Sequence, residues 1–229
     1  MGKLILVLAA ASVMTSVVLA ADPVLESKRD RISYAVGVDL VRNFRKQEVD
    51  FDADLVARGI RDALSTNKLL MPDKEMHVLL VNLQAEVRQK MAQTRRLATE
   101  DNRRRGAAYL EANKGKEGVV ALASGLQYRV IKSGVADGRK PLDTDTVECN
   151  YRGTLIDGSE FDGTDPGKPA SLRVSALIGG WREAVKLMPV GAKWQLVIPA
   201  NLAYGERGVG SEIGPNETLL FEVELVAIK

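Results

Sequence analysis

The sequence has little of the chemistry on which most enzymes depend. It contains one cysteine, Cys149, which excludes an intramolecular disulfide. It contains one histidine, His77, which disfavours a zinc site built on these residue types and a Ser-His-Asp triad. It also has no acidic loop with EF-hand spacing and no glycine loop ending in Gly-Lys-Ser/Thr. We therefore expect no metal and no cofactor. Any catalysis must proceed without a covalent or strong acid–base step.

The sequence also lacks a charge excess. It has 32 Lys and Arg residues against 30 Asp and Glu residues, a net charge of +2, which disfavours nucleic acid as a partner. Hydrophobic residues make up 45% of the 229 positions and charged residues 27%, a composition typical of globular proteins. This length favours two domains of modest size.

The first segment is apolar. Lys3 precedes an uncharged stretch from Leu4 to Ala21, with residues suited to a cleavage site at its end. This pattern predicts a cleaved signal peptide over residues 1–20, with the mature chain beginning at Ala21 or Asp22. The alternative is an uncleaved membrane anchor, because about 18 apolar residues can just span a bilayer.

Residues 22–71 predict two short amphipathic helices. Apolar residues recur at helical spacing at 32–44 and again at 55–64, Asp52 suits an N-cap, and Asn67 suits the end of the second helix. Helices this short are unstable alone, so their apolar faces need a partner, and a second copy of the chain is the simplest one. We expect a homodimer whose interface contains Phe44, Val56, Ile60 and Leu64.

Residues 72–118 predict one long connecting helix. Pro72 suits its start, nothing breaks the pattern from Asp73 to Asn113, and Gly115 and Gly118 mark its end. Its second half is basic on every face and has few apolar residues. A helix that binds nucleic acid or a membrane surface is one interpretation of this pattern. We favour the other, a solvated rod on which nothing packs.

From residue 119 to residue 229 the pattern changes to strands and turns. Asp157-Gly158 is a hairpin signal, and the last segment alternates apolar and acidic residues. A short helix is expected at 181–188. Strands are expected at 126–131, 146–155, 160–162, 172–174, 193–198 and 219–228. The predicted architecture is an α+β domain in which a curved antiparallel sheet wraps one short helix, joined by the long helix to an all-α N-terminal domain.

The aromatic residues of this region lie beside glycines and turns, where side chains can line a cavity. Cys149 has no histidine partner and is expected to be an inert thiol. Rotation about a peptidyl-prolyl bond fits such a site, because its barrier of about 20 kcal/mol is amide resonance and no nucleophile is needed.

Five motifs then resemble, in order and spacing, those of the FKBP-type peptidyl-prolyl cis-trans isomerases. They are Asn150-Tyr151-Arg152-Gly153, the segment 157–162, Gly180-Trp181, Ala203-Tyr204-Gly205 and the segment 214–219. Segments 31–37, 57–63 and 111–119 resemble the macrophage infectivity potentiator subgroup of exported bacterial proteins, in which short helices interlock two chains.

The resemblance implies an isomerase that acts on proline-containing polypeptides in the periplasm or on the outer-membrane surface of a Gram-negative bacterium, with tacrolimus or rapamycin as inhibitors. It implies catalytic roles for Tyr151, Phe161, Asp162 and Tyr204. The residues that it implies for substrate binding are Leu177, Ile178, Trp181, Val209, Ile213 and Phe221. The segment from Phe161 to Pro169 is one residue shorter than in many members. The alternative function is a non-enzymatic chaperone or adhesion module that uses the same cleft.

Overall fold

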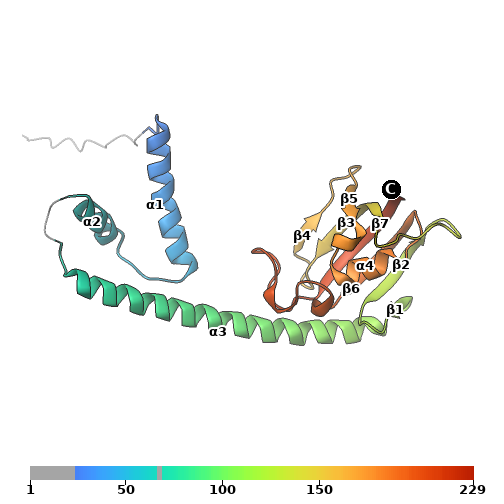
Figure 1. Ribbon diagram of the computed structural model, residues 1–229. Helices are drawn as coiled ribbons and strands as arrows, with labels where there is room; N and C mark the ends of the chain where they lie inside the picture. The colour runs from blue at the N-terminus through green and yellow to red at the C-terminus, as the bar shows by residue number, and fades with distance from the viewer. Residues whose placement is uncertain (1–23, 66–68) are drawn as a thin grey trace, which may run out of the picture. The chain divides into compact units, whose positions relative to one another are not determined.

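The chain divides into two compact units, and the division falls between Pro72 and Asp73. The computed structural model describes residues 24–65 and 69–229 (Figure 1). The predicted signal peptide and Asn67, the predicted end of the second helix, lie outside the described residues. Among the helices that are described, none combines the length and the apolar character needed to cross a membrane.

The first unit contains the two predicted short helices, α1 (Lys28–Lys46) and α2 (Ala53–Leu64). Ser27 caps α1 in a reciprocal pair of hydrogen bonds with Asp30. Asp52 caps α2 by accepting hydrogen bonds from the backbone N–H groups of Asp54 and Leu55, as the sequence predicted. These caps fix where both helices begin.

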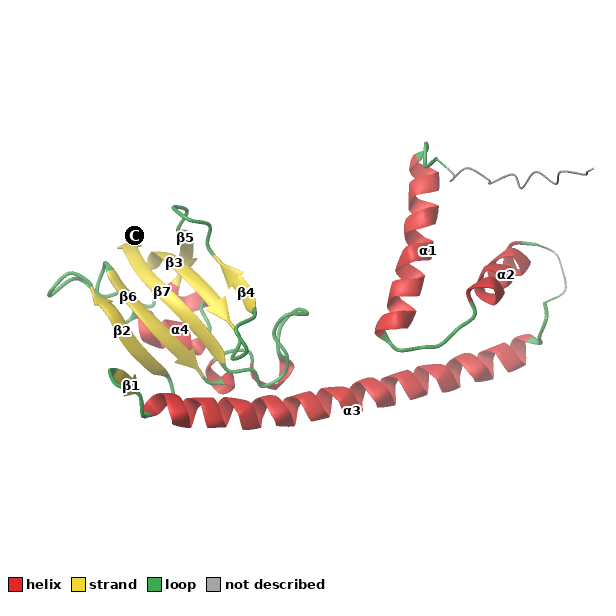
Figure 2. Cartoon of the chain, turned by 180° about the vertical axis from the view of Figure 1, so that it is seen from behind, coloured by secondary structure: helices red, strands yellow, loops and turns green. Residues whose placement is uncertain are grey.

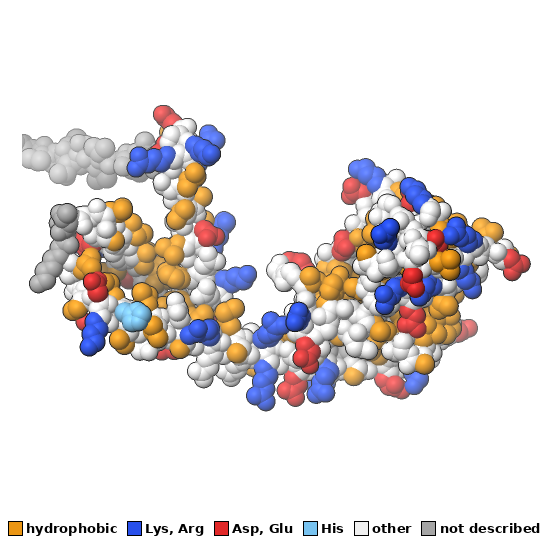
Figure 3. Space-filling view, in the orientation of Figure 1, with side chains coloured by type: hydrophobic (Ala, Val, Ile, Leu, Met, Phe, Trp, Pro, Cys, Tyr) orange, Lys and Arg blue, Asp and Glu red, His pale blue; other side chains and the backbone are white. Residues whose placement is uncertain are grey.

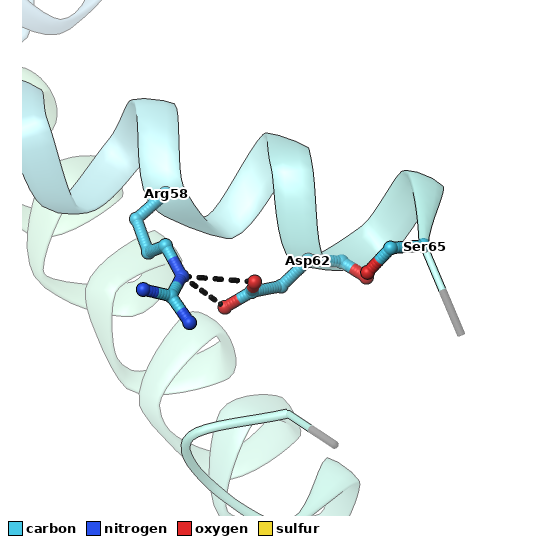
Figure 4. A network of polar contacts seen from close by, with 3 residues as sticks. All are labelled: Arg58, Asp62 and Ser65. Carbon is cyan, nitrogen blue, oxygen red and sulfur yellow. Dashed lines mark hydrogen bonds and ion pairs between the residues drawn. The ribbon is translucent and has the colours of Figure 1, made fainter. Parts of the chain in front are cut away.

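An ion pair connects two successive turns in the second half of α2. The Arg58 Nε lies 2.9 Å from each carboxylate oxygen of Asp62, and the Ser65 hydroxyl donates to the Asp62 carbonyl at 3.1 Å (Figure 4). Asp62 is only 5% exposed, so its charge depends on the guanidinium for compensation.

The first unit leaves most of its apolar surface uncovered. No residue of α1 is buried, and Ile60 and Leu64 of α2 are 52% and 85% exposed. Apolar side chains gather visibly on these helices (Figure 3). Of the other two residues predicted for a dimer interface, Phe44 and Val56 are half-buried, and the Phe44 ring packs on Phe51 at 5.0 Å.

The second unit begins with α3 (Asp73–Lys114), which follows Pro72 and ends directly before Gly115, as predicted. An antiparallel sheet follows, with the order β1-β2-β6-β7-β3-β4 and with β5 on β3 (Figure 2). Its strands are β1 (Val119–Ala121), β2 (Gln127–Ser133), β3 (Thr146–Thr154), β4 (Glu160–Gly163), β5 (Ala170–Arg173), β6 (Ala192–Ile198) and β7 (Leu219–Ile228). Its helices are η1 (Val174–Ala176), α4 (Gly179–Val185), η2 (Ala200–Leu202) and η3 (Gly205–Arg207). The predicted α+β architecture is confirmed.

The core lies between the sheet and α4. On β7, Leu219, Phe221, Val223 and Leu225 are buried, while Glu222 faces outward. Gly180 lets α4 approach β6, because a Cβ at this position would collide with Ile198. The short helix is thereby held directly against the sheet.

Cys149 lies in this core, fully buried. Burial raises the pKa of its thiol to about 12, so the thiolate does not form at physiological pH. This agrees with the predicted inert thiol.

The expectation that nothing packs on the second half of α3 is wrong. Asn102 and Asn113 are each 8% exposed, and the Asn113 amide donates to the Gln127 side chain at 2.9 Å. Gln127 in turn donates to the Leu110 carbonyl at 2.8 Å. These contacts are made by amide groups and by Gly106, whose backbone lies against Thr218, and such residues produce no apolar stripe in a sequence.

Candidate active site

A cavity of about 170 Å³ opens between the sheet, α4 and the segment that follows η2. Its walls are mainly apolar and aromatic, with a small number of polar groups, which is the usual composition of a small-ligand site. It is lined by Tyr151, Asp162, Leu172, Ala176, Leu177, Ile178, Trp181, Tyr204 and Phe221.

Three aromatic rings form a rigid corner in this cavity. Trp181, the third residue of α4, meets Tyr151 and Phe221 edge to face, with ring centroids 5.2 Å and 5.3 Å away. Phe221 meets Phe161 in the same way at 5.5 Å. Trp181 and Phe221 are 3% and 6% exposed, so packing around the cavity fixes their positions.

Gly153 on β3 permits this arrangement. A Cβ at this position would lie 2.7 Å from the Phe221 ring and 2.8 Å from the Phe161 ring, which is closer than the 3.4 Å at which ordinary contact begins. Only a glycine lets both rings approach the strand.

Tyr151 and Asp162 form the polar side of the cavity. The Tyr151 hydroxyl donates to one Asp162 carboxylate oxygen at 2.9 Å, and the other oxygen accepts from the Gly163 backbone N–H at 2.8 Å. Burial, followed by the hydrogen bond to Asp162, raises the pKa of Tyr151 to about 12. The phenol therefore stays protonated and keeps donating to the carboxylate.

Two further polar groups face the same cavity. Tyr204 follows η2 and is 38% exposed. The Ile178 backbone N–H, just before α4, donates to no backbone or side-chain group of the described residues. Both groups are free to donate to a carbonyl group of a ligand.

A larger groove of about 370 Å³ lies on the outward side of β3, β6 and β7. Three of its charged side chains are already in ion pairs: Lys193 lies 2.6 Å from Glu222, and Arg152 lies 2.6 Å from Glu160. It offers little apolar surface, so the smaller aromatic cavity is the better candidate for a hydrophobic ligand.

Two family profiles and several known proteins match this chain. The profile described as FKBP-type peptidyl-prolyl cis-trans isomerase matches residues 137–226, and that described as the domain amino terminal to FKBP-type peptidyl-prolyl isomerase matches residues 29–130. The outer membrane protein MIP of Legionella longbeachae is 44% identical over 206 residues, which cover 90% of this chain and 88% of the relative. The chain belongs to the FKBP-type peptidyl-prolyl cis-trans isomerase family.

Two further relatives support the same family. The peptidyl-prolyl cis-trans isomerase Mip of Coxiella burnetii is 36% identical over 90% of this chain and 89% of its own. The crystal structure of FkpA from Escherichia coli matches with a TM-score of 0.68 and 36% identity, over 90% of this chain and 99% of that one. The predicted isomerase activity is confirmed, and the non-enzymatic alternative is not favoured.

The structure brings together most of the residues that the FKBP resemblance predicted for the site. Tyr151, Asp162, Leu177, Ile178, Trp181, Tyr204 and Phe221 all line the cavity. The Phe161 ring packs on Phe221, and Val209 and Ile213 pair with each other in the loop that follows Tyr204. These last three are not among the lining residues.

Sequence reasoning missed Leu172 and Ala176, which also line the cavity. Leu172 was expected only as part of a strand. Ala176 belongs to the single turn η1 and had no periodic signal that could identify it.

Proposed function

We propose that this FKBP-type isomerase binds the proline ring of its substrate against Trp181, between Tyr151 and Phe221. The observation that carries the proposal is the corner of three packed aromatic rings in a small cavity that is lined mainly by apolar and aromatic side chains. Removal of water from the X-Pro amide disfavours its planar, charge-separated resonance form. The enzyme thereby favours the twisted transition state.

The polar groups of the cavity would orient the peptide. The Ile178 N–H and the Tyr204 hydroxyl can donate to substrate carbonyl groups. Asp162 accepts from Tyr151 and from Gly163, which supports a role in ordering the cavity wall. No proton transfer is needed in this mechanism, consistent with the raised pKa of Tyr151.

The test is the rate of cis–trans isomerisation of short proline peptides by purified full-length protein. Tyr204→Phe and Asp162→Ala should each lower kcat/KM, by about ten-fold if one charged or well-aligned hydrogen bond is lost. Tyr128→Phe is the matched control, because Tyr128 stacks on Trp194 away from the cavity. Wild-type values of kcat/KM in Tyr204→Phe and Asp162→Ala, as in the control, would contradict the proposed site.

The same cavity would accept macrolide inhibitors. Tacrolimus or rapamycin should compete with the peptide, since each would have to occupy the apolar surface around Trp181. Quenching of tryptophan fluorescence on titration measures this binding. An inhibitor that binds without slowing isomerisation would show that the two sites differ.

We also propose that the chain acts as a homodimer through its first unit. The support is the large apolar surface that a single copy leaves in water, including Leu55, Ile60, Leu64 and Leu70 at 52% exposure or more. A two-fold arrangement would bury this surface against itself, at about 25 cal/mol per Å² of apolar area.

Light scattering tests the dimer. Ile60→Asp should yield a monomer of half the mass and leave activity on short peptides nearly unchanged, because the cavity belongs to the second unit. Arg61→Asp, a change at an adjacent position about 100° round the helix, should remain dimeric. A monomeric wild-type protein at micromolar concentration would overturn the proposal.

Export to the cell envelope is the third part of the proposed function. The support is the apolar segment over residues 4–21 and a relative that carries the name outer membrane protein. The substrates would then be proline-containing polypeptides outside the cytoplasm. Mass spectrometry of the protein from a Gram-negative periplasm or outer membrane should find an N-terminus at Ala21 or Asp22, and an intact Met1 there would contradict the cleaved signal.

A further inference from the structure

The loop 205–218 follows directly after Tyr204 and carries its own internal hydrogen bonds. The Asn216 N–H donates to the Gly205 carbonyl at 2.8 Å and closes the base of the loop. Val209 and Ile213 exchange backbone hydrogen bonds of 2.9 Å and 3.2 Å across its middle. These bonds define the shape of the loop. They do not determine where the loop lies relative to the cavity.

The helix α3 supplies contacts that do hold the loop in place. Arg95 Nη2 donates to the carbonyl groups of Glu206 and Arg207 at 3.0 Å and 3.2 Å. Asn102 Nδ2 donates to the Pro215 carbonyl at 2.9 Å. One anchor therefore holds the beginning of the loop and the other holds its end.

Close packing reinforces the second anchor. Asn102 is 8% exposed, and Thr218, the last residue of the loop, is 3% exposed. A Cβ on Gly106 would collide with the Thr218 hydroxyl, so the helix backbone itself lies against the end of the loop. The loop lies beside α3 in both views of the chain (Figures 1 and 2).

These helix residues share one face. Arg95, Asn102 and Gly106 are separated by seven and four residues, which brings each back to within about 40° of the same direction. Arg96, which is exposed, lies about 100° away. The anchoring face therefore does not include Arg96.

We propose that Arg95 and Asn102 are positioning residues for the isomerase reaction. Neither lines the cavity, and both act through the loop that follows Tyr204. When the loop is anchored, Tyr204, which directly precedes it, is held at the cavity. Release of the anchors lets this side of the site move away. The inference rests on the proposed role of the cavity and adds α3 to the parts that shape it.

The experiment uses full-length protein with Arg95→Ala, the conservative variant Arg95→Lys and the matched control Arg96→Ala. Arg95→Ala should lower kcat/KM on short proline peptides by about three- to ten-fold, because hydrogen bonds from a charged donor to the loop are lost. Arg95→Lys should restore part of the rate, since a lysine can still donate to one carbonyl. Arg96→Ala should stay within about two-fold of wild type.

Amide hydrogen exchange separates positioning from general destabilisation. In Arg95→Ala the Val209, Ile213 and Asn216 amides should exchange faster, while the buried strand β6 keeps its wild-type protection. Asn102→Asp, whose fold is checked by circular dichroism, should act in the same direction because it places a carboxylate against the Pro215 carbonyl.

Three results would overturn the inference. They are unchanged loop exchange, faster loop exchange with unchanged kcat/KM, and faster exchange of β6 and the loop together. Failure of the proposed site itself would be seen differently, as unchanged kcat/KM in Tyr204→Phe and Asp162→Ala.

Discussion

Replacement of Gly153 by alanine tests whether the close approach of two aromatic rings to β3 shapes the active site. The new methyl group would lie 2.7 Å from Phe221 and 2.8 Å from Phe161, whereas ordinary contact begins at 3.4 Å. The rings must therefore retreat by about 0.7 Å, or the strand must shift. Phe221 is 6% exposed and packs on Trp181, so its retreat disturbs the inner end of the cavity.

We expect Gly153→Ala to destabilise the second unit by about 1–3 kcal/mol, the usual cost of overpacking a core. It should also lower kcat/KM by about ten-fold, because displacements below 1 Å at a catalytic surface are costly. Urea denaturation and the peptide assay measure the two effects. Gly37→Ala adds the same methyl group where nothing lies within 4 Å, and should not destabilise. Wild-type stability and activity in Gly153→Ala would refute the reasoning.

Three titratable groups with a raised pKa, Cys149, Tyr151 and Glu217, give further predictions. Cys149, whose pKa burial raises to about 12, should resist thiol reagents in the native protein and react once urea unfolds it. Tyr151, with a pKa of about 12, should ionise after the exposed phenols in an alkaline absorbance titration, and Tyr151→Phe should remove that last step. Because the pKa of Tyr151 is higher in the folded protein than in the unfolded chain, its contribution to stability is lost as the pH rises above about 10. Glu217 has its pKa raised chiefly by burial, so its ionised form costs stability at neutral pH; Glu217→Gln should raise the urea midpoint at pH 7 more than at pH 4.

Elements with a clear periodic pattern could be predicted closely from the sequence. The last strand was expected over 219–228 and is β7 with these bounds, because its inward residues are apolar at every second position. The long helix was expected from Asp73 to Asn113 and ends one residue later, since proline and glycine mark both ends. Local sequence rules were sufficient in both elements.

The site could be predicted only where motifs mark it. Trp181 and Tyr204 each lie in a short glycine-bearing motif, so the resemblance located them without knowledge of the fold. Leu172 and Ala176 reach the cavity only because β5 pairs with β3 and η1 packs against α4. Their role depends on tertiary placement, which no local pattern records.

The packing of α3 shows why a polar helix can be misread as a solvated rod. Arginine and asparagine side chains look solvent-exposed in a sequence, yet here their donors satisfy carbonyl groups that a surface loop cannot pair by itself. A mid-helix glycine at position 106 is the remaining sequence signal, because a helix tolerates its cost where another backbone or side chain must approach closely. The contacts between α3 and the sheet domain therefore extend along the helix at least as far as Arg95. An isomerase fragment that began at residue 119 would lose both anchors of the loop beside its active site.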